Sequence, residues 1–171
     1  SGKMGVTLAI QAADHGAKVD LILGPSAVSF THPNITIYRV QSAEDMYERV
    51  DVLFDKSDIS IFSAAVSDYK PIKYSNQKIK SKENIQNLKL EKSIDIMANT
   101  ISKHKGIKIA FSLETEDGEK NAINKMKAKG ADYIVLNYAN EPGAGFNEDT
   151  NHVYLFSKNG LNKELKKNTK L

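Results

Sequence analysis

Segments whose apolar residues recur at helical spacing alternate along this chain with short runs of β-branched and aliphatic residues. The helical spacing predicts helices over residues 6–16, 42–56, 95–104 and 119–129. The first of these stops at Gly16, the second opens at Ser42, a residue type that caps helix N-termini, and the last is closed by Gly130. The short apolar runs predict strands over residues 18–24, 34–40, 58–66, 88–91, 107–113, 132–137 and 152–156.

The order of these elements predicts an α/β fold. Strands and helices alternate as they do in a Rossmann-like, doubly wound and mostly parallel sheet with helices on both faces. One domain is expected over residues 1–157, followed by a lysine-rich tail, 158–171, that frays. Residues 67–87 are polar, contain five lysines and show no sustained periodicity, so we expect a flexible flap over about residues 70–87.

The first predicted helix follows directly on the turn Ser1-Gly2-Lys3-Met4-Gly5. A helix that opens an α/β domain is usually fed by a strand through a glycine-rich turn. We therefore expect a first strand, together with part of its turn, upstream of residue 1.

Composition narrows the classes of protein that this chain can belong to. Its 171 residues are 40% hydrophobic and 26% charged, as in a soluble globular domain with one core. Its apolar runs fall far short of the roughly 20 residues that a membrane span requires, which excludes a membrane protein. The formal net charge of +3 is too small to predict nucleic-acid binding. Cysteine is absent, which rules out thiolate chemistry and fits a reducing cytoplasm.

Doubly wound folds bind ligands at the carboxyl ends of their parallel strands. The chain leaves such ends at residues 66–68, 113–115 and 137, where short polar side chains can donate or accept hydrogen bonds. The Gly2–Gly5 turn opens a helix, and a helix N-terminus attracts anions. The pattern thus predicts a phosphate-bearing ligand, although neither a P-loop motif nor a dinucleotide glycine motif occurs. None of the histidines has metal-ligand spacing; they are His15, His32, His104 and His152.

Several short motifs follow one another in a fixed order. They are Ser1-Gly2-Lys3-Met4-Gly5, Gly16-Ala17-Lys18-Val19 with Leu23-Gly24-Pro25, Ala64-Ala65-Val66-Ser67-Asp68-Tyr69, Lys78-Ile79-Lys80, Phe111-Ser112-Leu113-Glu114-Thr115 and Gly145-Phe146-Asn147. Over about residues 1–157 this series resembles the phosphopantothenoylcysteine synthetase family, the ligase domain of the bacterial bifunctional coenzyme A biosynthesis protein. The motifs that contain Ala64 and Lys78 are the most specific.

The resemblance implies a two-step, CTP-dependent ligation in the cytoplasm. The carboxylate of 4′-phosphopantothenate attacks the α-phosphate of CTP, with Mg²⁺, to give an acyl-cytidylate and pyrophosphate. The amine of cysteine then displaces CMP, giving 4′-phospho-N-pantothenoylcysteine. The resemblance further implies a homodimer whose flap reaches the neighbouring active site, and an upstream asparagine that helps to stabilise the intermediate. FMN is implied only if a decarboxylase domain precedes the chain.

Lys78 is the predicted catalytic residue, because it matches the first lysine of the family's flap motif, which contacts the triphosphate and the reacting phosphoryl group. By composition alone, a lysine in a polar loop is simply solvated. Lys80 lies two residues further along and would point the same way in an extended flap, so it is the main rival for this role. Lys82 is a weaker third candidate.

The resemblance assigns a larger set of residues to the nucleotide. They are Phe62, Ser63, Ala64, Ala65, Asp68, Lys78, Ile94, Asp95, Ile96, Met97, Phe111, Lys125 and Lys129. Several have structural alternatives: Asp68 suits an Asx turn, Asp95 suits a helix N-cap, and Phe111 suits a core. Lys125 and Lys129 share a helix face that could equally be solvated. Ser93-Ile94 also departs from the Asn-Pro that is common in the family.

A different class of function stays open, namely a Rossmann-like nucleotide-binding module or a dehydrogenase relative without ligase activity. Such a dehydrogenase would use a Tyr-x-x-x-Lys pair, and Tyr69 and Lys73 have this spacing. Pro71 lies between them and disfavours the helix that would stack the two side chains. The residues themselves do not decide between CTP and ATP, and similarity to the bifunctional type favours CTP.

Overall fold

The computed structural model describes residues 2–73, 75, 77, 87–100, 105–141 and 150–169, with the side chains of the last segment as far as Leu165. The helices are α1 (Lys3–Asp14), α2 (Ala43–Leu53), α3 (Ile96–Thr100) and α4 (Gly118–Ala128), and the 3-10 turn η1 (Phe54–Lys56) follows α2. The strands are β1 (Val19–Leu23), β2 (Ile35–Arg39), β3 (Ile59–Phe62), β4 (Tyr69–Pro71), β5 (Leu90–Lys92), β6 (Ile107–Glu114), β7 (Tyr133–Tyr138), β8 (Thr150–Ser157) and β9 (Asn162–Thr169).

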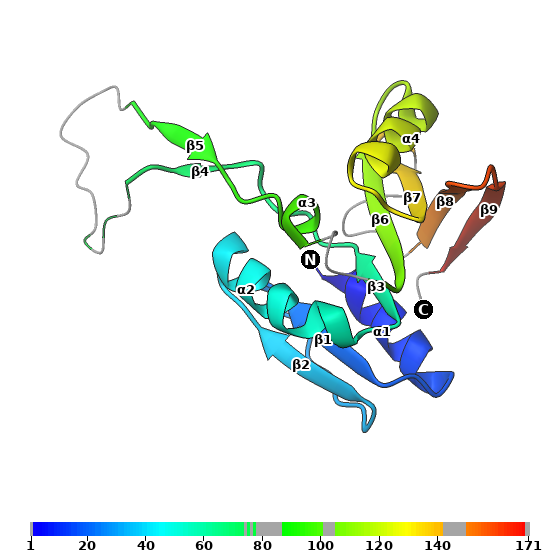
Figure 1. Ribbon diagram of the computed structural model, residues 1–171, viewed down its shortest axis with the longest axis horizontal. Helices are drawn as coiled ribbons and strands as arrows, with labels where there is room; N and C mark the ends of the chain where they lie inside the picture. Colours follow the sequence, from blue (N-terminus) through cyan, green and yellow to red (C-terminus); the bar gives the residue numbers. More distant parts are fainter. Residues whose placement is uncertain are drawn as a thin grey trace.

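Parallel pairing dominates the part of the fold that carries the helices. Strand β1 pairs in parallel with β2, and β3, β6 and β7 lie side by side in parallel (Figure 1). Strand β8 is antiparallel to β7, and β9 is antiparallel to β8. The predicted Rossmann-like α/β fold with a mostly parallel sheet is confirmed, with antiparallel strands added at one edge.

Helices cover both faces of the β1–β2 sheet, as predicted. Ile22 of β1 packs against the cluster formed by Val50 and Phe54 on the α2 side. The next residue, Leu23, lies at the start of α1, where its Cδ1 atom is 3.1 Å from the position that a Cβ on Gly2 would occupy. Because successive residues of a strand point to opposite faces, α1 and α2 lie on opposite sides of this sheet.

Among the described residues, the core consists of two apolar clusters. The α4 cluster joins α4 to β6, β7 and β8 and consists of Met97, Ala110, Ala122, Met126, Ala131, Ile134, Leu136 and Phe156. The α2 cluster joins α2 to α3 and consists of Val50, Phe54 and Ile96. Phe62, at the end of β3, packs against both clusters, and its ring meets that of Phe54 edge to face at 5.7 Å. The two halves of the molecule are therefore joined at the carboxyl end of β3.

The start of α2 is fixed as the sequence predicts. Ser42 accepts a hydrogen bond on its hydroxyl from the Asp45 amide, at 3.0 Å. The Asp45 carboxylate in turn accepts from the Ser42 amide, at 2.9 Å, which completes a capping box. This helix end is thus encoded by two residues three positions apart.

Strand β3 is shorter than predicted. The expected strand ran to residue 66, but pairing with β6 ends at Phe62. A Cβ added to Gly5 of α1 would lie 3.1 Å from the Ser63 hydroxyl, so the next residue already faces the first turn of α1. The small residues after Phe62 therefore leave the sheet as a segment that passes close to a helix start.

The expectation that the chain frays beyond residue 157 is wrong. Residues Asn162–Thr169 form β9 and pair with β8. Gly160 turns the chain with a φ of 88°, and the Ser157 hydroxyl accepts a hydrogen bond from the Leu161 amide at 3.1 Å. The polar, lysine-rich sequence hid this strand, because its pairing relies on a hairpin with β8 rather than on apolar alternation.

The predicted flap region begins and ends in a two-stranded ladder. Strands β4 and β5 pair antiparallel and extend away from the rest of the molecule (Figure 1). Four apolar side chains on or next to these two strands are each at least half exposed: Tyr69, Ile72, Leu88 and Leu90. The Lys70 ammonium pairs with Glu44 of α2 and lies 3.7 Å from the Glu91 carboxylate, which ties the base of the ladder to the body. Residues 74, 76 and 78–86 lie outside the described residues.

Among the described residues, no helix has both the length and the apolar character needed to cross a membrane.

Asp132 ties the start of β6 to the β8–β9 turn. Its carboxylate accepts a hydrogen bond from the Lys108 amide at 2.8 Å and pairs with the ammonium groups of Lys108, at 3.4 Å, and Lys158. Burial alone would raise the pKa of the Asp132 carboxyl, but the bonds from Lys158 and Lys108 together outweigh it and hold that pKa below its usual value. The ionised carboxylate therefore stabilises the fold at neutral pH.

We expect Asp132→Asn to lower the free energy of unfolding at pH 7 by about 1–3 kcal/mol. The reason is that the largely buried Lys108 ammonium loses its carboxylate partner. The depressed pKa means that the wild-type advantage is present above the unfolded-state pKa and is lost as the pH falls through the folded-state value. Urea unfolding at pH 7 and at about pH 3 measures both effects.

The control is Lys158→Ala, whose removed ammonium is on a side chain that is 61% exposed. We expect it to cost under about 1 kcal/mol. A pH-independent difference between Asp132→Asn and the wild type would contradict the assignment.

Candidate functional site

The turn that opens α1 lies beside the carboxyl end of β3. Gly2 caps the helix with a φ of 75°, a conformation that disfavours other residue types. A Cβ on Gly2 would stand 3.0 Å from the Ser26 hydroxyl, and one on Gly5 would stand 3.1 Å from that of Ser63. The Gly2–Gly5 turn and the segment after β3 are therefore in contact, as the predicted strand-end site requires.

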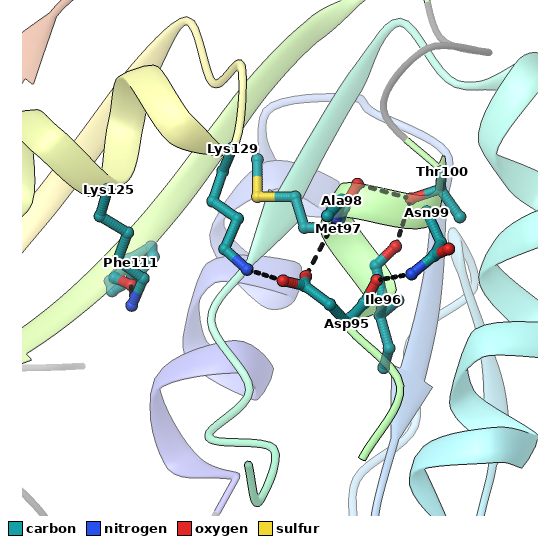
Figure 2. Close-up of polar contacts among 9 residues, drawn as sticks. All are labelled: Asp95, Ile96, Met97, Ala98, Asn99, Thr100, Phe111, Lys125 and Lys129. Carbon is teal, nitrogen blue, oxygen red and sulfur yellow. Dashed lines mark hydrogen bonds and ion pairs between the residues drawn. The ribbon is translucent and has the colours of Figure 1, made fainter. Parts of the chain in front are cut away.

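Lys125 and Lys129 lie on one face of α4 and reach toward β6 and the start of α3 (Figure 2). The Lys125 ammonium donates to the Phe111 carbonyl of β6, at 2.9 Å. The Lys129 ammonium pairs with the Asp95 carboxylate. Two predicted lysines, a predicted carboxylate and a predicted aromatic residue are thus brought together from three chain segments. We call Asp95, Lys125 and Lys129 the lysine–aspartate cluster.

Asp95 has a second contact in this cluster. Its Oδ1 atom accepts a hydrogen bond from the Ala98 amide at 3.0 Å, so that the carboxylate caps the first turn of α3. Burial raises the pKa of the Asp95 carboxyl, but the hydrogen bonds from Lys129 and Ala98, with the nearby charge of Lys125, outweigh it and lower that pKa below its usual value. Asp95 therefore caps α3, as the structural alternative expects, and the same carboxylate is the partner of Lys129.

The neighbours of Asp95 contribute differently. Ile96 and Met97 are each only 7% exposed and belong to the core clusters, so their side chains anchor α3. Only their backbone atoms could contact a ligand. Ile94 and Phe111 are partly buried, and the Phe111 carbonyl is already engaged by Lys125.

The remaining strand-end candidates lie on the segment after β3. Ser63 is partly buried, whereas Ala64, Ala65 and Asp68 are exposed. The Asp68 carbonyl accepts a hydrogen bond from the Ser93 amide at 2.9 Å, which brings this segment within two residues of Asp95. Lys78, the predicted catalytic residue, and its rival Lys80 lie outside the described residues.

Glu114 has a structural role that its place at a strand end did not reveal. Its carboxylate accepts hydrogen bonds from the Ser112 hydroxyl at 2.6 Å and from the Asn121 amide at 3.2 Å. Asn121 belongs to α4 and also donates to the Glu116 carbonyl. The end of β6 therefore holds α4 at its N-terminal half, while Lys125 holds the same helix further along.

His152 is the centre of a charged group that the sequence did not indicate. Its ring lies 2.5 Å from the Glu141 carboxylate and 2.9 Å from that of Glu164, and the side chain is 14% exposed. The hydrogen bond that the His152 ring donates to Glu141, followed by the one that it donates to Glu164, raises the pKa of His152 despite its partial burial. No spacing signal could show this, because Glu164 reaches His152 only through the unpredicted β9.

A separate hollow of about 520 Å³ lies at the start of α4, lined by Asp117, Gly118, Glu119, Lys120, Ile123, Asn124 and Tyr138. Residue 118 must be a glycine, because the Cβ of any other residue would lie 2.6 Å from the Tyr138 ring. Its lining includes two acidic side chains, Asp117 and Glu119, and one basic side chain, Lys120, so the hollow suits a polyanion less well than the two lysines of the lysine–aspartate cluster do.

Within the described part of the chain, no cluster of three histidine or acidic side chains could hold a metal ion. Magnesium in nucleotide sites is commonly bound by one or two carboxylates together with substrate phosphates. The lysine–aspartate cluster contributes one carboxylate of this kind, Asp95, which is paired with Lys129.

Comparison with known proteins identifies the family of this chain. The family model for the DNA/pantothenate metabolism flavoprotein C-terminal domain matches residues 1–171. The Bacillus subtilis (strain 168) protein described as coenzyme A biosynthesis bifunctional protein CoaBC is 40% identical over 96% of this chain and 41% of its own length. A crystal structure of the C-terminal domain of a CoaBC protein matches with a TM-score of 0.81 and 33% identity, over 99% of this chain and 76% of that one.

A protein from an unknown prokaryotic organism, described as a cysteine/cysteine sulfinic acid decarboxylase, is also 40% identical, over 97% of this chain and 47% of its own length. The chain thus spans less than half the length of these curated relatives. The chain belongs to the DNA/pantothenate metabolism flavoprotein C-terminal domain family. The resemblance to the phosphopantothenoylcysteine synthetase family is confirmed, because the C-terminal domain of the CoaBC relatives is phosphopantothenoylcysteine synthetase.

Proposed function

We propose that this chain is the ligase domain that joins 4′-phosphopantothenate to cysteine with CTP in coenzyme A biosynthesis. The observation that carries the proposal is the lysine–aspartate cluster beside β6, formed by residues that the ligase motifs assign to the nucleotide. The 40% identity to a CoaBC protein across nearly the whole chain supports the same activity. The products are 4′-phospho-N-pantothenoylcysteine, CMP and pyrophosphate.

The first chemical step demands positive charge. A carboxylate attacks an α-phosphate that is itself anionic, so cations and N–H donors must converge where negative charge develops. Lys125 and Lys129 supply two ammonium groups on one helix face, and the start of α1 adds the positive end of a helix dipole near Ser63. Mg²⁺ enters bound to the triphosphate and neutralises part of its charge.

Lys78 is the proposed catalytic residue, with Lys80 as the alternative. Both belong to the polar flap, and the β4–β5 ladder that supports it extends away from the body of the molecule. We propose that the flap carries its lysines to the reacting phosphoryl group when the nucleotide is bound.

We propose a homodimer in which the flap reaches the active site of the neighbouring copy. The exposed apolar side chains of Tyr69, Ile72, Leu88 and Leu90 support this, because a water-exposed ladder with so many apolar groups gains stability when a partner covers it. We place the enzyme in the cytoplasm. FMN is proposed only if a decarboxylase domain precedes this chain.

The dehydrogenase alternative receives no support from the described geometry. Tyr69 and Pro71 lie on strand β4, so Tyr69 and Lys73 are not stacked on consecutive turns of a helix. The decarboxylase name of one relative describes a whole protein of which this chain spans 47%.

The first prediction concerns the nucleotide. We expect this chain to bind CTP with Mg²⁺ more tightly than ATP, and Lys129→Met to weaken CTP binding by about tenfold, the effect of losing roughly 1.4 kcal/mol at one charged contact. Calorimetric titration measures both. Lys127→Met on the same helix is the matched control and should bind CTP normally. Equal or stronger ATP binding would remove the CTP assignment.

The second prediction concerns assembly. Sedimentation of the natural protein that contains this chain should give a homodimer, and a double variant, Leu88→Ser with Leu90→Ser, should weaken it by exposing less apolar surface for the partner to cover. A monomer at micromolar concentration would contradict the proposed exchange of flaps.

The third prediction separates chemistry from binding. In the natural protein that contains this chain, Lys78→Gln should lower turnover by about 10²–10³-fold, the usual loss for one preorganised electrostatic group, while CTP affinity falls much less. Release of CMP with phosphopantothenate and cysteine reports turnover. Lys80→Gln is the matched comparison and should do less harm. The reverse ranking would move the catalytic assignment by two residues, and near-normal turnover in both variants would overturn it.

A further inference from the structure

The two oxygens of the Asp95 carboxylate have different partners. One accepts the Ala98 amide and caps α3, and the other receives the Lys129 ammonium from α4 (Figure 2). One carboxylate therefore joins the start of α3 to the C-cap residue of α4, 34 positions further along the chain.

The backbone of Lys129 belongs to the end of α4, but its side chain points away from that helix. Lys129 is the C-cap residue of α4, and its backbone amide donates to the Lys125 carbonyl at 2.9 Å. Its side chain reaches out of the helix to Asp95 and remains 27% exposed. A lysine side chain has large rotational freedom, so a fixed anionic partner is what gives this ammonium a defined place.

The pair is open to a ligand on its solvent side. The Asp95 side chain is 44% exposed, and an ammonium group has three N–H donors, of which the Asp95 contact uses one. The same ammonium can therefore hold Asp95 and an anionic oxygen together. Lys125, fixed to the Phe111 carbonyl, stands on the same helix face.

We propose that Asp95 is a positioning residue that holds the Lys129 ammonium in place for an anionic phosphate of the bound nucleotide. This inference rests on the proposed nucleotide site and names the group that preorganises it. Asp95 has two opposite effects on phosphate binding. It holds the Lys129 ammonium in position, which favours binding, but its own negative charge repels the phosphate. The two effects predict opposite results when the carboxylate is neutralised.

Asp95→Asn is the informative variant. Asparagine is also a good N-cap and can still accept the Ala98 amide, but it cannot form the ion pair with Lys129. We expect its affinity for CTP with Mg²⁺ to fall by about threefold to tenfold, although it removes a negative charge from the site. If Asp95 were only a nearby charge, the same variant would bind CTP more tightly.

A double-mutant cycle identifies the group through which Asp95 acts. In the Lys129→Met background, Asp95→Asn should leave CTP affinity unchanged within about twofold, because the ammonium that it positions is gone. Asp132→Asn is the matched control: it also removes a lysine-paired carboxylate, but one whose partners are Lys108 and Lys158 rather than Lys129, and it should leave CTP affinity unchanged. Thermal unfolding of each variant without CTP checks that the fold is retained.

The outcomes separate this inference from the proposed function. Weaker CTP binding by Asp95→Asn in the wild-type background, lost in the Lys129→Met background, supports it. Equal or tighter binding by Asp95→Asn overturns it while leaving the nucleotide site in place, as does a loss of the same size in both backgrounds. Failure of the unmodified chain to bind CTP would refute the proposed function itself.

Discussion

The packing of α4 against β6 and β7 is the interaction on which the candidate site depends. Ala122 and Met126 of α4 are buried against Ala110, Ile134 and Leu136 of the sheet, and the first of these helix residues is fully enclosed. Small alanine side chains at both surfaces let helix and sheet approach closely. This contact fixes the distance of α4 from the sheet and its rotation about its own axis. It thereby determines which groups the side chains of Lys125 and Lys129 can contact.

Polar contacts then fix the helix along its length. Glu114 holds Asn121 near the start of α4, Lys125 reaches the Phe111 carbonyl in the middle, and Lys129 reaches Asp95 at the end. Each contact joins α4 to an element whose own position is set by the core, β6 in two cases and α3 in the third. The candidate site is therefore held in place on the side of the sheet.

The sequence was informative where a residue's role depends on near neighbours. The N-cap at Ser42, the alternation of strands and helices that predicts a mostly parallel sheet, and the shared helix face of Lys125 and Lys129 all follow from local patterns. It failed for β9, whose polar residues pair only because a turn at Gly160 returns them to β8. The pairing of Asp95 with Lys129 could not be foreseen either, because it depends on how α3 and α4 pack, which local patterns do not contain. Lys78 remains a prediction from the motif.

The most direct test is to soak crystals of this chain with CTP and Mg²⁺ and to determine the structure of the complex. We predict that phosphate oxygens lie within hydrogen-bonding distance of the Lys129 and Lys125 ammonium groups, beside the carboxyl end of β3 and Phe111 of β6, with Asp95 still in contact with Lys129. CTP bound instead in the hollow beside Tyr138, with both lysines still on their present partners and no phosphate near them, would contradict it.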